Sequence, residues 1–267
     1  MDASGWPAFL APTHFTEPAA VLAGLAAVLL VGLSKGGLGG DFALLGVPIL
    51  SLVMPPVQAA ALLLPLLLAM DAVGLWTWRG RFDRATLVAM LPAAAVGIAV
   101  GGFTAAITSE AAVRLIVGLV ALAFALRSFW TMRPDRAAAP ARPPSRWSAW
   151  FWGGVAGFTS FVAHAGGPPY QVHTLPLRLD PKVYTGTSVI FFAVVNLVKV
   201  VPYAVLGQFD ARTLLSALVL VLPGALAVLA GAALVRRMRP AVFYPFMLAM
   251  VGLVGVRLVW DGVRGLL

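Results

Sequence analysis

The chain has 267 residues, of which 61% are hydrophobic and only 11% are charged, with a mean hydropathy of +0.94. A soluble domain of this size could not bury so much apolar surface, which excludes that class and predicts an all-α polytopic membrane protein. The net charge of +9 falls in short loops between apolar runs, where it signals orientation and not nucleic-acid binding, and the lack of cysteine excludes disulfides, thiolate metal sites and cysteine nucleophiles.

The first half contains two short apolar runs followed by three long ones. The short runs cover residues 19–33 and 41–54, and the long runs cover residues 57–78, 85–107 and 110–131. About 20 apolar residues in a helix cross roughly 30 Å of hydrocarbon, so each long run predicts a transmembrane helix.

The second half repeats this order. Its short runs cover residues 147–163 and 169–178, and its long runs cover residues 183–206, 212–235 and 240–260. Together the two halves predict about 8–10 membrane segments.

Matching fragments indicate an internal duplication. RFDRATL at 81–87 and QFDARTL at 208–214 are offset by 127 residues, and the Gly39-Gly40 pair is offset from Gly166-Gly167 by the same distance. We therefore predict two transmembrane repeats.

The repeats are assigned to residues 1–131 and 147–267. Between them, residues 132–146 are rich in proline, alanine and arginine, a composition typical of a flexible linker, here on the cytoplasmic side.

The basic residues indicate how the chain crosses the membrane, because short cytoplasmic loops are enriched in lysine and arginine. Four groups hold 13 of the 19 basic residues: Arg79, Arg81 and Arg84; Arg127 to Arg146; Arg178 and Lys182; and Arg236, Arg237 and Arg239. All four reach the cytoplasm only if each half begins with a hairpin that enters and leaves on one side, followed by three crossings. Both termini are then periplasmic, and the two repeats are inverted relative to each other.

Each half also contains a short apolar run broken by glycines and small polar residues. The first break is GLSKGGLGGDF at 32–42, and the second break is GFTSFVAHAGGPPY at 157–170. Non-helical backbone at membrane depth is tolerated where it is buried or lines a cavity, and a helix N-terminus after a break offers free N–H groups to an anion.

Two such breaks facing each other predict one anion site, although glycines also serve close helix packing. The candidate binding residues are Ser34, Lys35, Gly36, Gly37, Gly39 and Gly40 in the first break, and Thr159, Ser160, His164, Gly166, Gly167 and Tyr170 in the second.

Lys35 is the sharpest candidate, because a lysine inside a membrane segment is costly and usually faces a bundle interior or a pathway. Its alternative role is an ion pair with Asp41 across the loop. Asp71, Asn196 and Lys199 lie within long runs and are further candidates, with Asp41, for coupling or for the pathway. Inversion places the nearer ends of their helices on opposite faces, so no direct bridge between Asp71 and Lys199 is expected.

Four polar residues, Tyr184, Thr185, Thr187 and Ser188, open the long run after the second break. They can contact a substrate, but hydrogen bonding to the preceding helical turn is the commoner role of such hydroxyls. No paired carboxylates and no hydrolase, nucleotide-binding or metalloprotease motif stand out, so we expect neither an enzyme nor a metal or other cofactor.

The duplicated breaks, the prolines Pro48 and Pro176 that follow them, and the chain length resemble the TauE/SafE family of sulfite exporters and related anion permeases, over residues 19–262. The resemblance implies a secondary transporter, an exporter of small anions such as sulfite, thiosulfate, sulfoacetate or other small organic acids. It also implies a multi-pass protein of the bacterial inner membrane. Protons are a candidate coupling ion, because Asp71 is a candidate coupling carboxylate. An anion channel and a non-transporting membrane scaffold stay open as alternatives, as does the oligomeric state.

Overall fold

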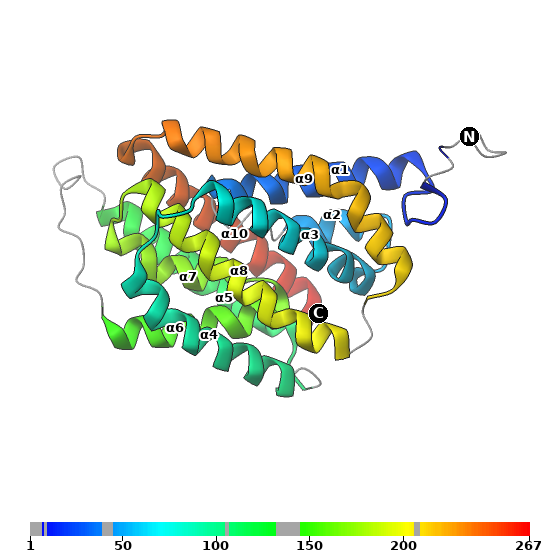
Figure 1. Cartoon of the computed structure of the whole chain (residues 1–267). Helices are drawn as coiled ribbons and strands as arrows, with labels where there is room; N and C mark the ends of the chain where they lie inside the picture. Colours follow the sequence, from blue (N-terminus) through cyan, green and yellow to red (C-terminus); the bar gives the residue numbers. More distant parts are fainter. Residues whose placement is uncertain (1–6, 8–9, 39–44, 105–106, 132–144, 206–208) are drawn as a thin grey trace.

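A computed structural model describes residues 7, 10–38, 45–104, 107–131, 145–205 and 209–267 (Figure 1). Every element within these residues is helical. The elements of the first half are α1 (Pro18–Leu33), the π-helical turn η2 (Ser34–Leu38), α2 (Gly46–Leu50), α3 (Pro56–Thr77), α4 (Arg84–Thr104) and α5 (Glu110–Thr131). Those of the second half are α6 (Arg146–Ala163), α7 (Gly167–Thr174), the 3-10 turn η5 (Leu175–Leu177), α8 (Pro181–Val205), α9 (Ala211–Arg237) and α10 (Pro240–Leu266).

Seven of these helices are long and apolar enough to cross a membrane: α1 with η2, α3, α4, α5, α8, α9 and α10. This confirms the predicted polytopic helical membrane protein. The α6 helix of 18 residues is not among the seven, and α2 and α7 have only 5 and 8 residues. The second arms of the two predicted hairpins, α2 and α7, are therefore helices that are too short to span a bilayer alone.

The matching heptapeptides form the same local structure. Asp83 Oδ2 accepts a hydrogen bond of 2.7 Å from the backbone N–H of Thr86 at the start of α4. Asp210 Oδ1 accepts one of 2.6 Å from Thr213 at the start of α9. An aspartate in this position caps a helix N-terminus by satisfying one of its free N–H groups. The likeness of the two fragments is therefore a shared helix start.

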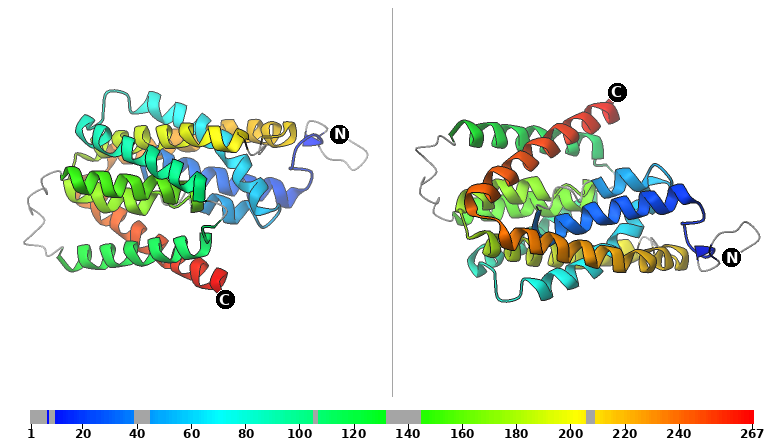
Figure 2. Two further views of the ribbon diagram at one scale, coloured as in Figure 1. Left: turned by 90° about the horizontal axis from the view of Figure 1, so that it is seen from below. Right: turned by 90° about the horizontal axis from the view of Figure 1, so that it is seen from above.

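Helix packing is reciprocal between the halves. The first helix of each half packs on the fourth helix of the other, as α1 does on α9 and α6 on α4. The pairs α3·α8 and α5·α10 each join equivalent helices, and Figure 2 shows α5 and α10 lying against each other along one side of the bundle. In Figure 1, α1 starts at the end marked N, whereas α6 starts at the opposite end. This pattern supports the predicted inversion.

The described basic groups gather at one end of the bundle, on the left in Figure 1, where α3, α5 and α9 end. One contact there joins the two halves: Arg236 at the end of α9 donates a hydrogen bond of 2.8 Å to the carbonyl oxygen of Thr77. Arg236 also lies over the ring of Trp78 at 5.3 Å from its centroid. Most of the predicted linker, residues 132–144, lies outside the described residues.

Glycines allow α4 and α6 to approach until their backbones touch. A Cβ atom at Gly97 would lie 2.0 Å from the carbonyl oxygen of Gly154, and one at Gly157 would lie 2.1 Å from that of Ala94. Small residues are the usual means of close packing between membrane helices, because apolar side chains gain little from leaving lipid. The nearest neighbour of a Cβ at Gly154 would be 3.6 Å away, which is ordinary contact.

The two glycines Gly157 and Gly154, one turn apart on α6, therefore predict opposite results for the same change. Gly157→Ala should force α4 and α6 apart and destabilise the protein by about 1–3 kcal/mol, the usual cost of overpacking. Gly154→Ala should be neutral or slightly stabilising, because alanine favours helix. Thermal unfolding in detergent measures both variants, and equal melting temperatures would contradict this packing.

Candidate functional site

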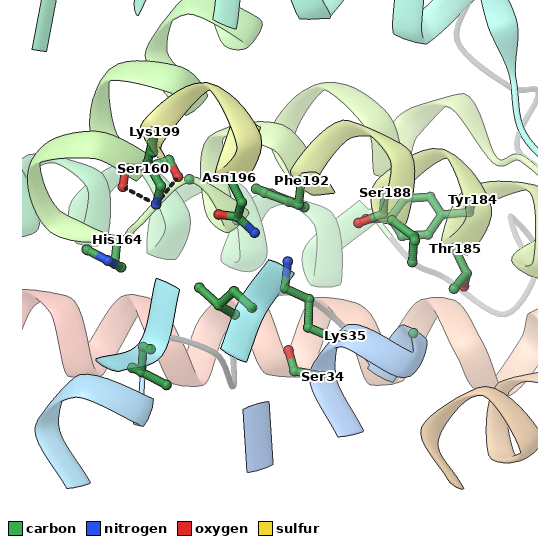
Figure 3. A pocket seen from close by; sticks show the side chains of 16 residues that line it. Ser34, Lys35, Ser160, His164, Tyr184, Thr185, Ser188, Phe192, Asn196 and Lys199 are labelled. Atoms are coloured by element: carbon green, nitrogen blue, oxygen red, sulfur yellow. Dashed lines mark hydrogen bonds between the residues drawn. The ribbon is translucent and has the colours of Figure 1, made fainter. Parts of the chain in front are cut away.

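The first break follows the end of α1 and begins with a turn that glycine makes possible. Residues Ser34–Leu38 form the π-helical turn η2, in which Gly37 has φ +128°, a conformation that other residues rarely adopt. A Cβ at Gly37 would also lie 2.5 Å from the Cγ2 atom of Thr185 on α8. The wide turn presents Lys35 to the interior of the bundle, as Figure 3 shows.

The second break ends α6 by a left-handed residue. His164 has φ 54°, and its backbone N–H bonds the carbonyl oxygen of Thr159. The Thr159 hydroxyl donates to the carbonyl oxygens of Val155, at 2.8 Å, and of Ala165, at 3.1 Å. Thr159 therefore holds the turn together, and α7 begins three residues after His164.

A cavity of about 60 Å³ lies between the two breaks and α8 (Figure 3). A buried water needs about 10–15 Å³ by this measure, so the cavity has room for a few waters or for one small anion. Its lining residues are Ser34, Lys35, Gly37, Leu63, Leu67, Ser160, His164, Gly166, Gly167, Tyr184, Thr185, Ser188, Val189, Phe192, Asn196 and Lys199.

A buried ion pair borders the cavity. Lys35 Nζ lies 2.6 Å from Asp71 Oδ1, and the two side chains are 10% and 3% exposed. The second carboxylate oxygen of Asp71 accepts a hydrogen bond of 2.7 Å from Asn196 Nδ2. Both oxygens thus have a donor that itself lines the cavity. The alternative partner of Lys35, Asp41, lies outside the described residues.

Lys199 is a second buried lysine in the cavity wall, at 1% exposure. Its Nζ donates to the carbonyl oxygen of Ser160, at 3.2 Å, and to the Ser160 hydroxyl, at 3.4 Å. That carbonyl belongs to the last turn of α6, the negative end of the helix dipole. Among the ion pairs of the described residues, Lys199 and Asp71 do not form one, although Lys199 lies within electrostatic reach of both Asp71 and Lys35.

The site therefore has more basic than acidic side chains. In the described part of the chain, the buried Lys199 and the mostly buried Lys35 lie near the single carboxylate of Asp71. The wall has two further titratable groups, Tyr184 and His164, and His164 Nε2 lies 3.4 Å from the hydroxyl of Tyr203. An excess of buried ammonium groups is costly by itself and is offset best by a bound anion.

Three predicted binding residues lie away from the cavity. Thr159 serves the turn, as described above. Gly36 faces α9, where a Cβ would lie 2.4 Å from the carbonyl oxygen of Val228, so it has the packing role that glycines also serve. Tyr170 is buried against Phe191, with ring centroids 4.8 Å apart.

Asp71, a predicted coupling or pathway residue, does not itself line the cavity but contacts the lining residues Lys35 and Asn196. Gly39, Gly40 and Asp41 lie outside the described residues. The predicted residues that line the cavity are Ser34, Lys35, Gly37, Ser160, His164, Gly166, Gly167, Asn196 and Lys199. Residues from both breaks thus meet at one cavity.

Comparison with known families agrees with this arrangement. A model of the family described as sulfite exporter TauE/SafE matches residues 24–258. The chain belongs to the TauE/SafE family. Comparisons with curated proteins and with solved structures gave no match. The family is one of membrane transporters, which fits the seven apolar helices, and the match confirms the resemblance seen in the sequence.

In this TauE/SafE member, residues that the sequence singled out separately form one wall on α8, together with Phe192, which it did not single out. Thr185, Ser188, Phe192, Asn196 and Lys199 follow one another at intervals of three or four residues, which places them on one helix face. The spacing of these residues in the sequence indicates a single helix face. Thr187, outside this stripe, follows the commoner pattern for hydroxyls and donates to the carbonyl oxygen of Val183 at 2.7 Å.

Thr185 adds a buried hydroxyl to this TauE/SafE cavity. The side chain is 1% exposed, and its oxygen has no hydrogen-bond partner among the described residues. Buried hydroxyls are rarely left without a partner in native proteins. The oxygen therefore fits a ligand or a water in the cavity.

A second cavity opens at the basic end of the TauE/SafE bundle and has a volume of about 430 Å³. Its lining residues are Trp76, Thr77, Trp78, Arg79, Arg81, Lys182, Leu229 and Arg236. The indole N–H of Trp78 donates a hydrogen bond of 3.1 Å to the carbonyl oxygen of Gly36. Because Gly36 follows Lys35 directly, this bond connects the wall of the basic cavity to the turn that carries the ion pair.

Proposed function

We propose that the chain is a secondary transporter that exports a small anion by alternating access. The observation that carries the proposal is the cavity between the two breaks, where Lys35 and Lys199 outnumber Asp71. A transporter site built by broken helices of two inverted halves lies where both halves can close over it from either side. The reciprocal packing of α1 on α9 and of α6 on α4 supports such a rocking motion.

The proposed substrates are sulfite, thiosulfate, sulfoacetate and other small organic acids. The cavity volume of about 60 Å³ supports a small molecule. The hydroxyls of Ser34, Ser160, Thr185 and Ser188, together with the two ammonium groups, provide donors for anionic oxygens.

A transport assay tests the role of Lys35. Lys35→Ala alone would leave Asp71 buried without its cation, at a cost of about 3–5 kcal/mol, and so confuse function with folding. The double variant Lys35→Ala/Asp71→Asn removes the pair together. We expect it to fold and to lose about tenfold or more in counterflow of labelled anion across proteoliposomes, because a hydrogen bond to a charged group contributes about 1.5–3 kcal/mol.

The matched control removes another ion pair, that of Arg257 and Asp261 on α10, which has 48% and 18% exposure. Arg257→Gln/Asp261→Asn should keep the counterflow of the wild type. Equal counterflow in both double variants would contradict the proposed site. Unitary currents in place of saturable counterflow would identify an anion channel, and the absence of any solute flux would favour the scaffold.

We further propose that the basic end faces the cytoplasm of a bacterial inner membrane and that both termini are periplasmic. The gathering of arginine and lysine at that end supports this orientation. The basic cavity there would collect anions before they reach the inner cavity.

The chain has no cysteine, so single cysteines report the orientation directly. Arg239 lies just after the end of α9, Ala211 lies at its start, and both residues are exposed. Each is replaced in turn, in the variants Arg239→Cys and Ala211→Cys. We expect an impermeant maleimide to label Ala211→Cys in intact cells and Arg239→Cys only in inverted membrane vesicles. The reverse labelling would overturn the orientation.

A further inference from the structure

We propose that Asp71 takes up a proton with each anion, which makes the transporter a proton–anion symporter. The proposal rests on the proposed function, since it assigns the coupling ion of the same cavity. It begins from the position of Asp71, a carboxylate that lies behind the lining of the anion cavity and whose two oxygens are both held by cavity-lining donors.

The same donors face the carboxylate and the cavity. Lys35 Nζ lies 2.6 Å from Oδ1 of Asp71, and Asn196 Nδ2 lies 2.7 Å from Oδ2. Both side chains are also part of the cavity wall. An anion in the cavity therefore competes with Asp71 for the ammonium group of Lys35 and for the amide of Asn196.

Burial makes this competition expensive for an ionised Asp71. The side chain is only 3% exposed, so water cannot replace the lost ammonium group. A buried carboxylate without its cation costs several kcal/mol, and a proton on the carboxylate removes that cost. Anion binding thus favours proton binding, and by linkage proton binding favours anion binding to the same extent.

Charged groups reach Asp71 from two neighbouring elements. Lys35 reaches it from η2, and Lys199 acts on it from α8, next to Asn196. Of the other elements packed on α3, the described α2 has no titratable side chain, and the charged residues of α9, Arg212, Arg236 and Arg237, lie at its ends. The half-buried His164 lies within electrostatic reach of Lys199.

Charge balance supports joint movement of the two ions. One singly charged anion and one proton together add no net charge to the site. The loaded and empty sites therefore have the same net charge, so the electrostatic cost of closing the halves over them is similar.

Symport also determines what drives export. A singly charged anion that leaves with one proton moves no net charge, so the membrane potential neither drives nor opposes it. Export then proceeds when the product of the anion and proton concentrations is higher in the cytoplasm than outside. A buried Asp71 with a purely structural role would leave anion movement free of protons.

The experiment measures protons and anions in the same vesicles. Proteoliposomes with a trapped pH dye are loaded with thiosulfate, which stays doubly ionised over the pH range. The membrane potential is clamped, because a divalent anion that leaves with one proton carries one net negative charge. We expect about one proton to leave with each thiosulfate, so that the lumen becomes alkaline as thiosulfate leaves. The apparent affinity for thiosulfate should fall by up to about tenfold for each unit by which the pH rises in the alkaline range.

Two variants complete the test. Asp71→Asn should reduce the ratio of protons to thiosulfate from about one to about zero and abolish the pH dependence, because asparagine cannot take up the proton. Asp261→Asn, at the exposed pair on α10, should keep the ratio of the wild type.

Each outcome decides a different claim. Thiosulfate efflux without protons in the wild type, or an unchanged ratio in Asp71→Asn, would overturn the symport and leave the proposed function standing. No flux of thiosulfate, sulfite, sulfoacetate or carboxylates would instead overturn the proposed function. The wild-type ratio decides the matter if Asp71→Asn does not fold.

Discussion

The ion pair between Lys35 and Asp71 is the interaction on which the centre of this structure depends. It joins the turn η2 to α3 within the first half, and the hydrogen bond from Asn196 extends it to α8 in the second half. Charged side chains at membrane depth are rare and are usually paired or part of a functional site. The pair satisfies Asp71 but leaves Lys199 in excess, so the same network that stabilises the fold prepares an anion site.

Close helix packing brings the pieces of this network together. The glycines of α4 and α6 permit backbone contact, and Gly36 does the same for η2 against α9. Each hairpin thereby packs on a long helix of the opposite half. If that packing were loosened, the two breaks would not share a cavity, and the two lysines would not face the same ligand. The small residues thus support function without touching the substrate.

Local signals in the sequence predicted most of the fold. The ten apolar runs correspond to the ten α-helices of the described residues, and the matching heptapeptides correspond to the capped starts of α4 and α9. These features depend on hydropathy and on residues close together in the chain, which is why a single sequence revealed them. The inversion of the repeats was a topological inference from charge, and the reciprocal packing supports it.

The site was predictable only in part. The breaks and Lys35 stood out, but the partner of Lys35 did not, because Asp71 is 36 residues away and packing selects it. Gly36 and Gly37 are the same residue type, and only the backbone angle and the position of α9 decide which one reaches the cavity. The apolar wall formed by Leu63, Leu67 and Phe192 carried no chemical signal, although the polar spacing along α8 did.

The central claim is that one anion is held between Lys35 and Lys199, and a bound structure tests it most directly. Selenite is chemically close to sulfite, and its selenium atom is located by anomalous scattering. We predict one selenium peak in the inner cavity, with its oxygens within hydrogen-bond distance of the ammonium groups of both lysines. A selenium peak only in the basic cavity, or none at saturating selenite, would contradict this account.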